Sequence, residues 1–272
     1  MIGMLRSEIY KLFKKKSFYI CGLISMVLIG LTVWTYEWQV NDQLGAQYAQ
    51  LGIPFDGIDL KRMGYTAWNA LEIFAQGSNI GLLCAIFSSI FVCSEFSSGA
   101  IKNLAIRGKN RFIMYFSKLI VCMLVPIIYV LFSALSAYLV GAYIWSAGEW
   151  KNQYVDSILI PIGLNTLVQV ILQSVLVMIG YLLRSSGWAM ALNFGIASGV
   201  VPALMMAGVN YISRNWFGIT NVVLSKYWIG FYEGKAWPLE DSIKSCIIWV
   251  FLAYLIIPSI IGSIVFWKRE IK

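Results

Sequence analysis

Long apolar segments alternate with short polar ones along the whole chain. Six of the apolar runs are almost free of charge, and each is long enough to cross a hydrocarbon layer of about 30 Å as a helix. Before the first of them, Leu5, Ile9 and Leu12 recur at helical spacing among basic residues, which is typical of a helix lying in a membrane interface. The pattern therefore predicts an all-α integral membrane protein with six transmembrane helices.

Charges and turn residues set the bounds of the segments within one membrane domain, residues 1–272. The predicted segments are an interfacial helix at 1–17, span one at 18–38, an extracellular loop at 39–72, span two at 73–93, a polar segment at 94–111, span three at 112–145, span four at 158–183, span five at 188–210, an outer re-entrant or interfacial segment at 211–242, and span six at 243–267. Pro126 is expected to kink span three, and Lys118 to extend its ammonium group back to the surface.

Residues 95–111 form a polar, basic island between two apolar runs. Ser98 is a candidate N-cap and Gly108 a candidate left-handed C-cap of a helix of about two and a half turns. Ile101 and Leu104 share one face, so this helix is suited to lie on the membrane surface or to dock into a groove. A solvated loop whose charges only follow membrane topology accounts for the same residues, so the spacing leaves both interpretations open.

Composition narrows the classes of function. Hydrophobic residues make up 59% and charged residues 12% of the 272 positions, as expected of a membrane protein. The net charge of +8 comes from basic residues at the ends of apolar runs, so nucleic-acid binding is not expected. Because the chain has no histidine, we expect no enzyme and no metal or cofactor site. The 5 cysteines lie in or beside apolar runs and are expected to be unpaired.

Polar and small residues inside the spans indicate helix contacts or a transport pathway. The amides that would lie within the membrane are Gln76, Asn79, Asn165, Gln169 and Gln173. The last three are spaced by four and share one helix face, where helix-to-helix hydrogen bonds and the lining of a substrate path are both possible. Small residues at every fourth position predict a face for close helix packing in span five, within the chain or with a second copy: Gly195, Gly199, Ala203 and Ala207.

Six spans place both termini on the same side of the membrane. If that side is the cytoplasm, most of the 21 lysines and arginines lie there, beside only Glu8, Glu95 and Glu270. This distribution follows the positive-inside rule. The expected location is therefore the cell membrane, with both termini and the island at residues 95–111 in the cytoplasm.

This succession of segments resembles the permease subunits of ABC-2-type exporters, especially the compact six-span kind found in lantibiotic self-immunity, bacitracin resistance and related export systems. The resemblance covers essentially the whole chain, from LRSEIYKLFKKKSF to the amphiphilic stretch before the last span, and its sharpest local match is EFSSGAIKNLAIRGKNRFIMYFSKLI. The residues that look like the family's Glu, Gly, Lys, Arg and Lys pattern are Glu95, Gly99, Lys102, Arg111 and Lys118. Many members have a proline where this chain has Gly108.

The resemblance implies a bacterial permease that pairs with a second copy or a paralogue and exports a hydrophobic or amphipathic cargo such as a peptide or an antibiotic. Residues 95–111 would form a coupling helix on a dimer of ABC ATPase subunits, which would bind ATP and magnesium; the chain itself has no Gly-rich phosphate loop. The residues implied to contact the ATPase are Glu95, Ser98, Gly99, Ile101, Lys102, Asn103, Leu104, Arg107, Gly108 and Arg111, flanked by Arg6, Glu8, Lys11, Lys14 and Lys15 of the interfacial helix.

Three other classes of function differ in the residues that they require. An ion-driven secondary transporter usually has ionisable residues at mid-membrane depth, and the interiors of the predicted spans contain none. An intramembrane protease of the prenyl-processing type needs a glutamate and histidine site, which a chain without histidine cannot form. A non-transporting immunity or sensory scaffold that binds a partner through residues 95–111 is compatible with the sequence.

Overall fold

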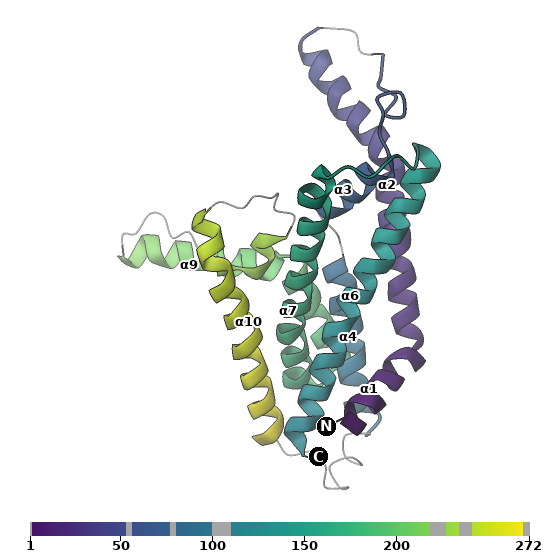
Figure 1. The fold of residues 1–272 in the computed structure, drawn as a ribbon. Helices are drawn as coiled ribbons and strands as arrows, with labels where there is room; N and C mark the ends of the chain where they lie inside the picture. The colour runs from purple at the N-terminus through teal and green to yellow at the C-terminus, as the bar shows by residue number, and fades with distance from the viewer. Residues whose placement is uncertain are drawn as a thin grey trace.

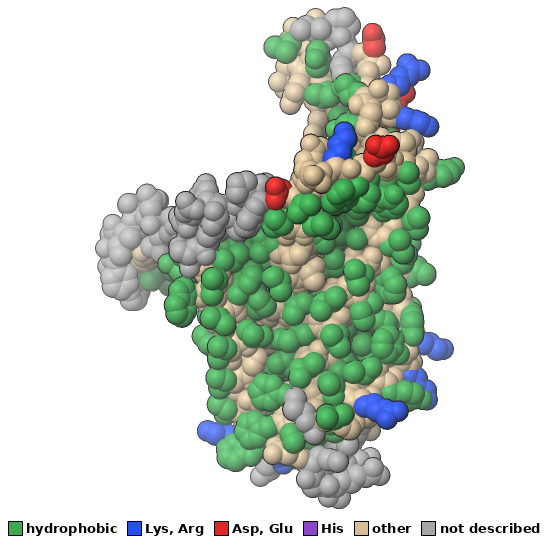
Figure 2. All heavy atoms as spheres, viewed as in Figure 1, with side chains coloured by type: hydrophobic (Ala, Val, Ile, Leu, Met, Phe, Trp, Pro, Cys, Tyr) green, Lys and Arg blue, Asp and Glu red, His purple; other side chains and the backbone are tan. Residues whose placement is uncertain are grey.

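The computed structural model describes residues 2–52, 56–76, 80–99, 110–217, 227–233 and 241–268. Every regular element in these ranges is helical, and five helices are long and apolar enough to cross a membrane, or six if one bent pair counts as a span. The long helices stand side by side in a bundle (Figure 1), and Figure 2 shows a broad band of hydrophobic side chains between two charged ends. The prediction of an all-helical, multi-pass membrane protein is therefore confirmed.

The first two helices meet at a sharp break. Helix α1 (Ile2–Lys14) ends before Lys15, which is extended, and α2 (Lys16–Gln50) then runs far beyond the predicted end of span one. The prediction of a loop from residue 39 was wrong as far as Gln50. A single Gly45 does not break the helix, which ends just before Gly52 with its positive φ of 68°. In Figure 1 this outer part of α2 projects from the bundle.

Span two is built from two helices instead of one. Helix α3 (Ala67–Gln76) lies near the end of the bundle opposite α1, which we call the outer end, and α4 (Ile80–Ser97) runs through the interior of the bundle (Figure 1). Helix α3 packs tightly on the next long helix, α6 (Arg111–Ile144), where a Cβ added to Gly141 would lie 2.5 Å from that of Ala70. The predicted start of span two therefore lies inside α3.

The longest helices are joined through hydroxyl groups. The Tyr129 hydroxyl of α6 donates to the carbonyl of Phe18 in α2 at 2.9 Å. After the π-helical turn η1 (Val155–Leu159) comes α7 (Ile160–Leu183), and its Ser174 hydroxyl donates to the carbonyl of Tyr254 in α10 (Asp241–Lys268). Pro258 has no N–H to offer that carbonyl, so Ser174 replaces the missing helical hydrogen bond.

Span five, predicted as one helix, is two helices with a sharp bend. Helix α8 (Ser186–Ala197) and the following residues 200–214 are inclined by 68°, and Gly199 between them has a positive φ of 78°. The prediction of a continuous small-residue face is therefore wrong, because Gly195 lies in α8 whereas Ala203 and Ala207 lie in α9 (Val200–Phe217). Helix α9 leaves the bundle sideways in Figure 1, and the short 3₁₀ turn η3 (Ile229–Tyr232) packs back onto α7 and α10.

Candidate functional site

Five charged side chains from three helices and one interhelix junction lie close together, and α1, which contributes two of them, lies at one end of the bundle (Figure 1). We refer to them as the charged cluster: Glu8, Lys11, Lys15, Glu95 and Lys118. Glu8 and Lys11 come from α1, Glu95 from the last turn of α4, and Lys118 from the second turn of α6, while Lys15 lies at the junction of α1 and α2. The cluster therefore ties the N-terminal helix to two membrane helices.

Four of these side chains form a closed ring of alternating charge. The Lys11 ammonium lies 2.5 Å from Glu8 and 2.9 Å from Glu95. The Lys118 ammonium lies 2.8 Å from Glu8 and 2.6 Å from Glu95. Each carboxylate thus contacts both lysines. Glu8 and Lys118 are almost fully buried, so removing either side chain would break buried ion pairs, which typically costs about 3–5 kcal/mol.

Lys118 was expected to extend to the surface, and this prediction was wrong. Its residue surface is only 1% exposed, and its ammonium lies 4.1 Å from the centre of the Phe91 ring. Two carboxylates and an aromatic face thus replace water around the charge. An acidic residue on the apolar face of α1 was the signal in the sequence: Glu8 is buried beside Leu12, one helical turn away.

Lys15 is the fifth member of the cluster, and it forms no ion pair with any residue in the described part of the chain. Its ammonium donates to the Ser94 hydroxyl and to the Phe91 carbonyl, the latter at 3.5 Å. Burial first, and then the nearby charge of Lys118, lower the pKa of Lys15 to about 8. Burial also disfavours the charged form of Lys11, but hydrogen bonds to Glu8 and Glu95 outweigh it and raise the pKa of Lys11.

The two helices that bracket residues 100–109 have well-defined ends beside the cluster. Helix α4 ends at Ser97, and Gly99 follows with a positive φ of 67°. Helix α6 begins after Asn110, whose side chain accepts from the Phe112 N–H at 2.9 Å as an N-cap. Arg111 donates to the Trp267 carbonyl near the end of α10 at 2.9 Å, so the start of α6 also contacts the last span.

Not every predicted contact residue joins the cluster. Ser98 is exposed just after α4, and Arg6 and Lys14 are exposed on α1. The residues that lie outside the described part of the chain are Ile101, Lys102, Asn103, Leu104, Arg107 and Gly108. The cluster thus combines Glu8, Lys11 and Lys15 of the predicted interfacial helix with Glu95 of the predicted coupling segment.

Two of the three amides of span four make hydrogen bonds to other segments of the bundle. Asn165 donates to the Ala75 carbonyl of α3 at 2.7 Å, and Gln169 donates to the Glu233 carboxylate at 3.0 Å. Gln173 is 1% exposed on the same helix. The Asn79 residue and the Gln76 side chain lie outside the described part of the structure.

Glu233 was not singled out from the sequence. It follows η3, and its carboxylate is the acceptor of the hydrogen bond from Gln169 of α7. Burial raises the pKa of Glu233 to about 7, and the hydrogen bond from Gln169 opposes this shift only in part. An acidic residue within an aromatic stretch was the only sequence signal, and it did not specify the partner helix.

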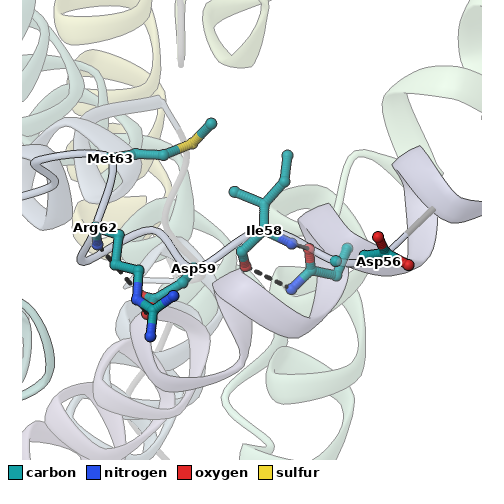
Figure 3. A pocket seen from close by; sticks show the side chains of 7 residues that line it. Asp56, Ile58, Asp59, Arg62 and Met63 are labelled. Atoms are coloured by element: carbon teal, nitrogen blue, oxygen red, sulfur yellow. Dashed lines mark hydrogen bonds and ion pairs between the residues drawn. The ribbon is translucent and has the colours of Figure 1, made fainter.

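A hollow of about 660 Å³ lies beside the end of α2 that projects from the bundle (Figure 3). The Asn41 amide makes two hydrogen bonds with the backbone of Ile58: it donates to the carbonyl at 3.0 Å and accepts from the N–H at 2.7 Å. Asp59 accepts from two backbone N–H groups and pairs with Arg62 at 3.1 Å. These polar groups fold the outer loop against α2, so the hollow is a less convincing site than the charged cluster.

Within the described ranges no group of three or more Cys, Asp or Glu side chains is arranged to hold a metal ion. Among known protein families, a model described as "Protein of unknown function (DUF2705)" matches residues 18–272. No curated protein matches the chain.

Proposed function

The chain belongs to the DUF2705 family, and we propose that it is the transmembrane permease subunit of an ATP-driven ABC exporter of the ABC-2 type. In this proposal ATP and magnesium bind a dimer of separate ATPase subunits, and residues 95–111 dock on that dimer. Two permeases, either identical copies or paralogues, enclose the transport path. The chain lies in the cell membrane of a bacterium with both termini in the cytoplasm, and it catalyses no reaction itself.

The observation that supports this proposal best is the ring of Glu8, Lys11, Glu95 and Lys118. Glu95 is the first residue of the segment proposed to meet the ATPase, and the ring joins it to α1 and α6 through four ion pairs of 2.5 to 2.9 Å. Opening the ring would break ion pairs between largely buried groups, which is costly. A displacement applied near Glu95 would therefore move the ends of α1, α4 and α6 together.

The proposed mechanism begins when ATP draws the two ATPase subunits together. Their movement displaces residues 95–111 of each permease, and the charged ring transmits this displacement to α1 and α6. Helix α6 runs the full depth of the bundle, so a shift at its Lys118 end alters its packing on α2 at the other. The permease pair thus changes between states that are open to the membrane or cytoplasm and states that are open to the outside.

The cargo proposed is a hydrophobic or amphipathic compound, such as a peptide or an antibiotic, so the exporter would serve self-immunity or resistance. This assignment rests on the resemblance to ABC-2-type permeases and on an apolar, aromatic chain with 15% Phe, Trp and Tyr. A non-transporting immunity or sensory scaffold would bind a partner through residues 95–111 without moving a cargo.

A secondary transporter is the second candidate, because one observation favours it. Glu233 is an acidic group with a pKa raised to about 7, and it is hydrogen-bonded to Gln169 of a membrane-spanning helix. Such a group can load and release a proton near neutral pH. This candidate requires transport that is driven by a pH gradient in the absence of any ATPase.

The proposal predicts that the chain co-purifies with an ATPase and that Gly99→Val breaks the complex. Gly99 has a positive φ of 67° at the start of the proposed coupling segment, where a β-branched residue distorts the backbone. We expect the amount of ATPase recovered with the chain to fall at least tenfold. The measurement is affinity purification of the chain from membranes of the cells that naturally produce it, followed by quantification of the ATPase subunits recovered with it.

Gly52→Val is a closely matched control. Gly52 also has a positive φ, 68°, and neither glycine has a neighbour within 4 Å of an added Cβ, but Gly52 lies at the outer end of α2. This variant should retain the ATPase. Equal recovery of the ATPase with both variants would argue against the proposal. If the chain alone carries out proton-driven uptake, and Glu233→Gln abolishes that uptake, the secondary transporter replaces the exporter as the function.

A further inference from the structure

An apolar cavity of about 380 Å³ lies on the side of the bundle away from the charged cluster's α1 helix, between α7, α8, α9 and α10. Its volume is in the range of about 300–1,000 Å³ that is usual for small-molecule sites. Val175 of α7, Ile196 of α8, Met206 of α9 and Tyr254 of α10 form its walls, and Trp228 closes it beside η3. The proposed ATPase contact does not use this cavity.

The bend at Gly199 creates the cavity. Ile196 lies just before the bend and Val201 just after it, and both line the cavity. A straight helix would continue along the bundle, but the 68° bend carries α9 away from α7 and α10. The cavity is the space between these diverging helices. Its existence therefore depends on the course of the backbone and not on the rotamer of one side chain.

The chemistry of the walls suits a hydrocarbon chain. Among the described residues that line the cavity none is charged, and their side-chain nitrogen and oxygen atoms are those of Tyr227, Trp228 and Tyr254. Cavities lined by apolar side chains do not hold water well, because water needs two to four polar partners. An aliphatic chain can fill the space through dispersion contacts without leaving a polar group unsatisfied.

The cavity lies at membrane depth and is continuous with the surface that faces lipid. Tyr254 is eight residues into the apolar span Cys246–Lys268, which places it about 12 Å along that helix. Met205 lines the cavity and is nevertheless 67% exposed, next to Leu204, which is also 67% exposed on the outer surface of α9. The bilayer that surrounds the apolar band therefore has direct access to the cavity.

We propose that this cavity binds one acyl chain of a membrane lipid and so stabilises the bend between α8 and α9. The continuity of the cavity with the lipid-facing surface selects this occupant. A second copy of the chain would need a side chain that reaches past α9, whereas lipid chains already surround the opening. The site binds the acyl chain of the lipid and does not discriminate between head groups. It is independent of any ATPase.

The 272-residue chain is first washed extensively in detergent, and then dioleoyl phosphatidylglycerol or dioleoyl phosphatidylcholine is added. Native mass spectrometry then counts the lipid molecules bound to each chain. The unsubstituted chain should retain one lipid of either head group. Met206→Trp places a larger side chain in the cavity and should reduce the retained lipid at least tenfold. Leu204→Trp is the matched control, because Leu204 lies two positions away on α9 outside the lining, and it should retain lipid within twofold of the unsubstituted chain.

A second measurement detects the lipid in the unsubstituted chain, with Trp228 at the edge of the cavity as the reporter. Lipid with brominated acyl chains should quench the tryptophan fluorescence of the unsubstituted chain, and Trp228→Phe should remove a saturable part of that quenching. The proposal fails if the unsubstituted chain retains no lipid, if Met206→Trp and Leu204→Trp retain equal amounts, or if Trp228→Phe leaves the quenching unchanged. A dimer that carries no lipid would identify a second copy as the occupant and would also overturn the proposal.

Discussion

The charged cluster contains one more lysine than its carboxylates can pair. Glu8 and Glu95 each contact both Lys11 and Lys118, and these four charges balance. Lys15 is left with a hydroxyl, a carbonyl and the face of Phe91, whose centre is 4.8 Å from the ammonium. Burial of this unpaired ammonium, and then its proximity to the charge of Lys118, lower the pKa of Lys15 to about 8.

The lowered pKa predicts how stability depends on pH. In the unfolded chain Lys15 keeps its proton up to the ordinary pKa of 10.5, whereas in the folded chain it loses the proton near pH 8. The unfolded state therefore binds more protons between these values, and the free energy of unfolding should rise with pH in that window. Thermal unfolding at pH 7 and pH 9.5 measures this. The Tm of the unsubstituted chain should rise relative to that of Lys15→Met, and a constant difference would contradict the account.

At the scale of elements, the ring explains why α1 is held against the bundle. Only Glu8 and Leu12 of α1 are buried, and the helix is separated from α2 by the extended Lys15. Met4, Leu5 and Ile9 are only partly buried against the core, so apolar burial on this 13-residue helix is modest. The ion pairs from Glu8 and Lys11 to Glu95 and Lys118 therefore provide much of the attachment.

Replacing Lys118 with methionine should release α1 from the bundle. The substitution leaves Glu8 and Glu95 with Lys11 as their shared partner, and the loss of a buried pair typically costs about 3–5 kcal/mol. Amide hydrogen exchange in α1 should accelerate on the order of a hundredfold or more. Lys14→Met, on the exposed side of α1, should leave the exchange unchanged. If both variants exchange at the same rate as the unsubstituted chain, the ring does not hold α1.

The lengths of the apolar runs in the sequence predicted the membrane helices well, but they did not predict where these helices break or extend further. The apolar runs of spans three, four and six correspond to the long helices α6, α7 and α10 because such runs leave no alternative in a bilayer. The helix of span one continues to Gln50 because polar residues also form helices. The bend at Gly199 depends on one positive φ, and repeated small residues look the same in a straight helix.

The cluster was predicted only in part, for a similar reason. Glu8, Lys11, Lys15 and Glu95 were assigned to two neighbouring segments, but their junction with Lys118 requires α1, α4 and α6 to converge. Sequence spacing reports faces within one helix and carries no information on such convergence. Glu233 and Gln169 were missed as a pair because 64 residues separate them.

At the scale of the whole molecule, the two ends of the bundle differ in charge. Figure 2 shows Lys and Arg side chains at the end that holds α1 and the end of α10, whereas acidic and basic side chains both occur at the opposite end. This asymmetry supports a cytoplasmic location of the cluster under the positive-inside rule. An ATPase in the cytoplasm would then meet residues 95–111 beside the charged ring, and the apolar cavity would remain on the lipid side of the molecule.

The most direct test of the central claim is a cross-link in membranes that contain both the chain and the ATPase. A photoreactive residue is placed either at Lys102, within the proposed coupling segment, or at Lys61, in the outer loop. The account predicts an adduct with the ATPase from position 102 and none from position 61. No ATPase adduct from position 102, or an equally strong one from position 61, would contradict the claim that energy enters this protein through residues 95–111.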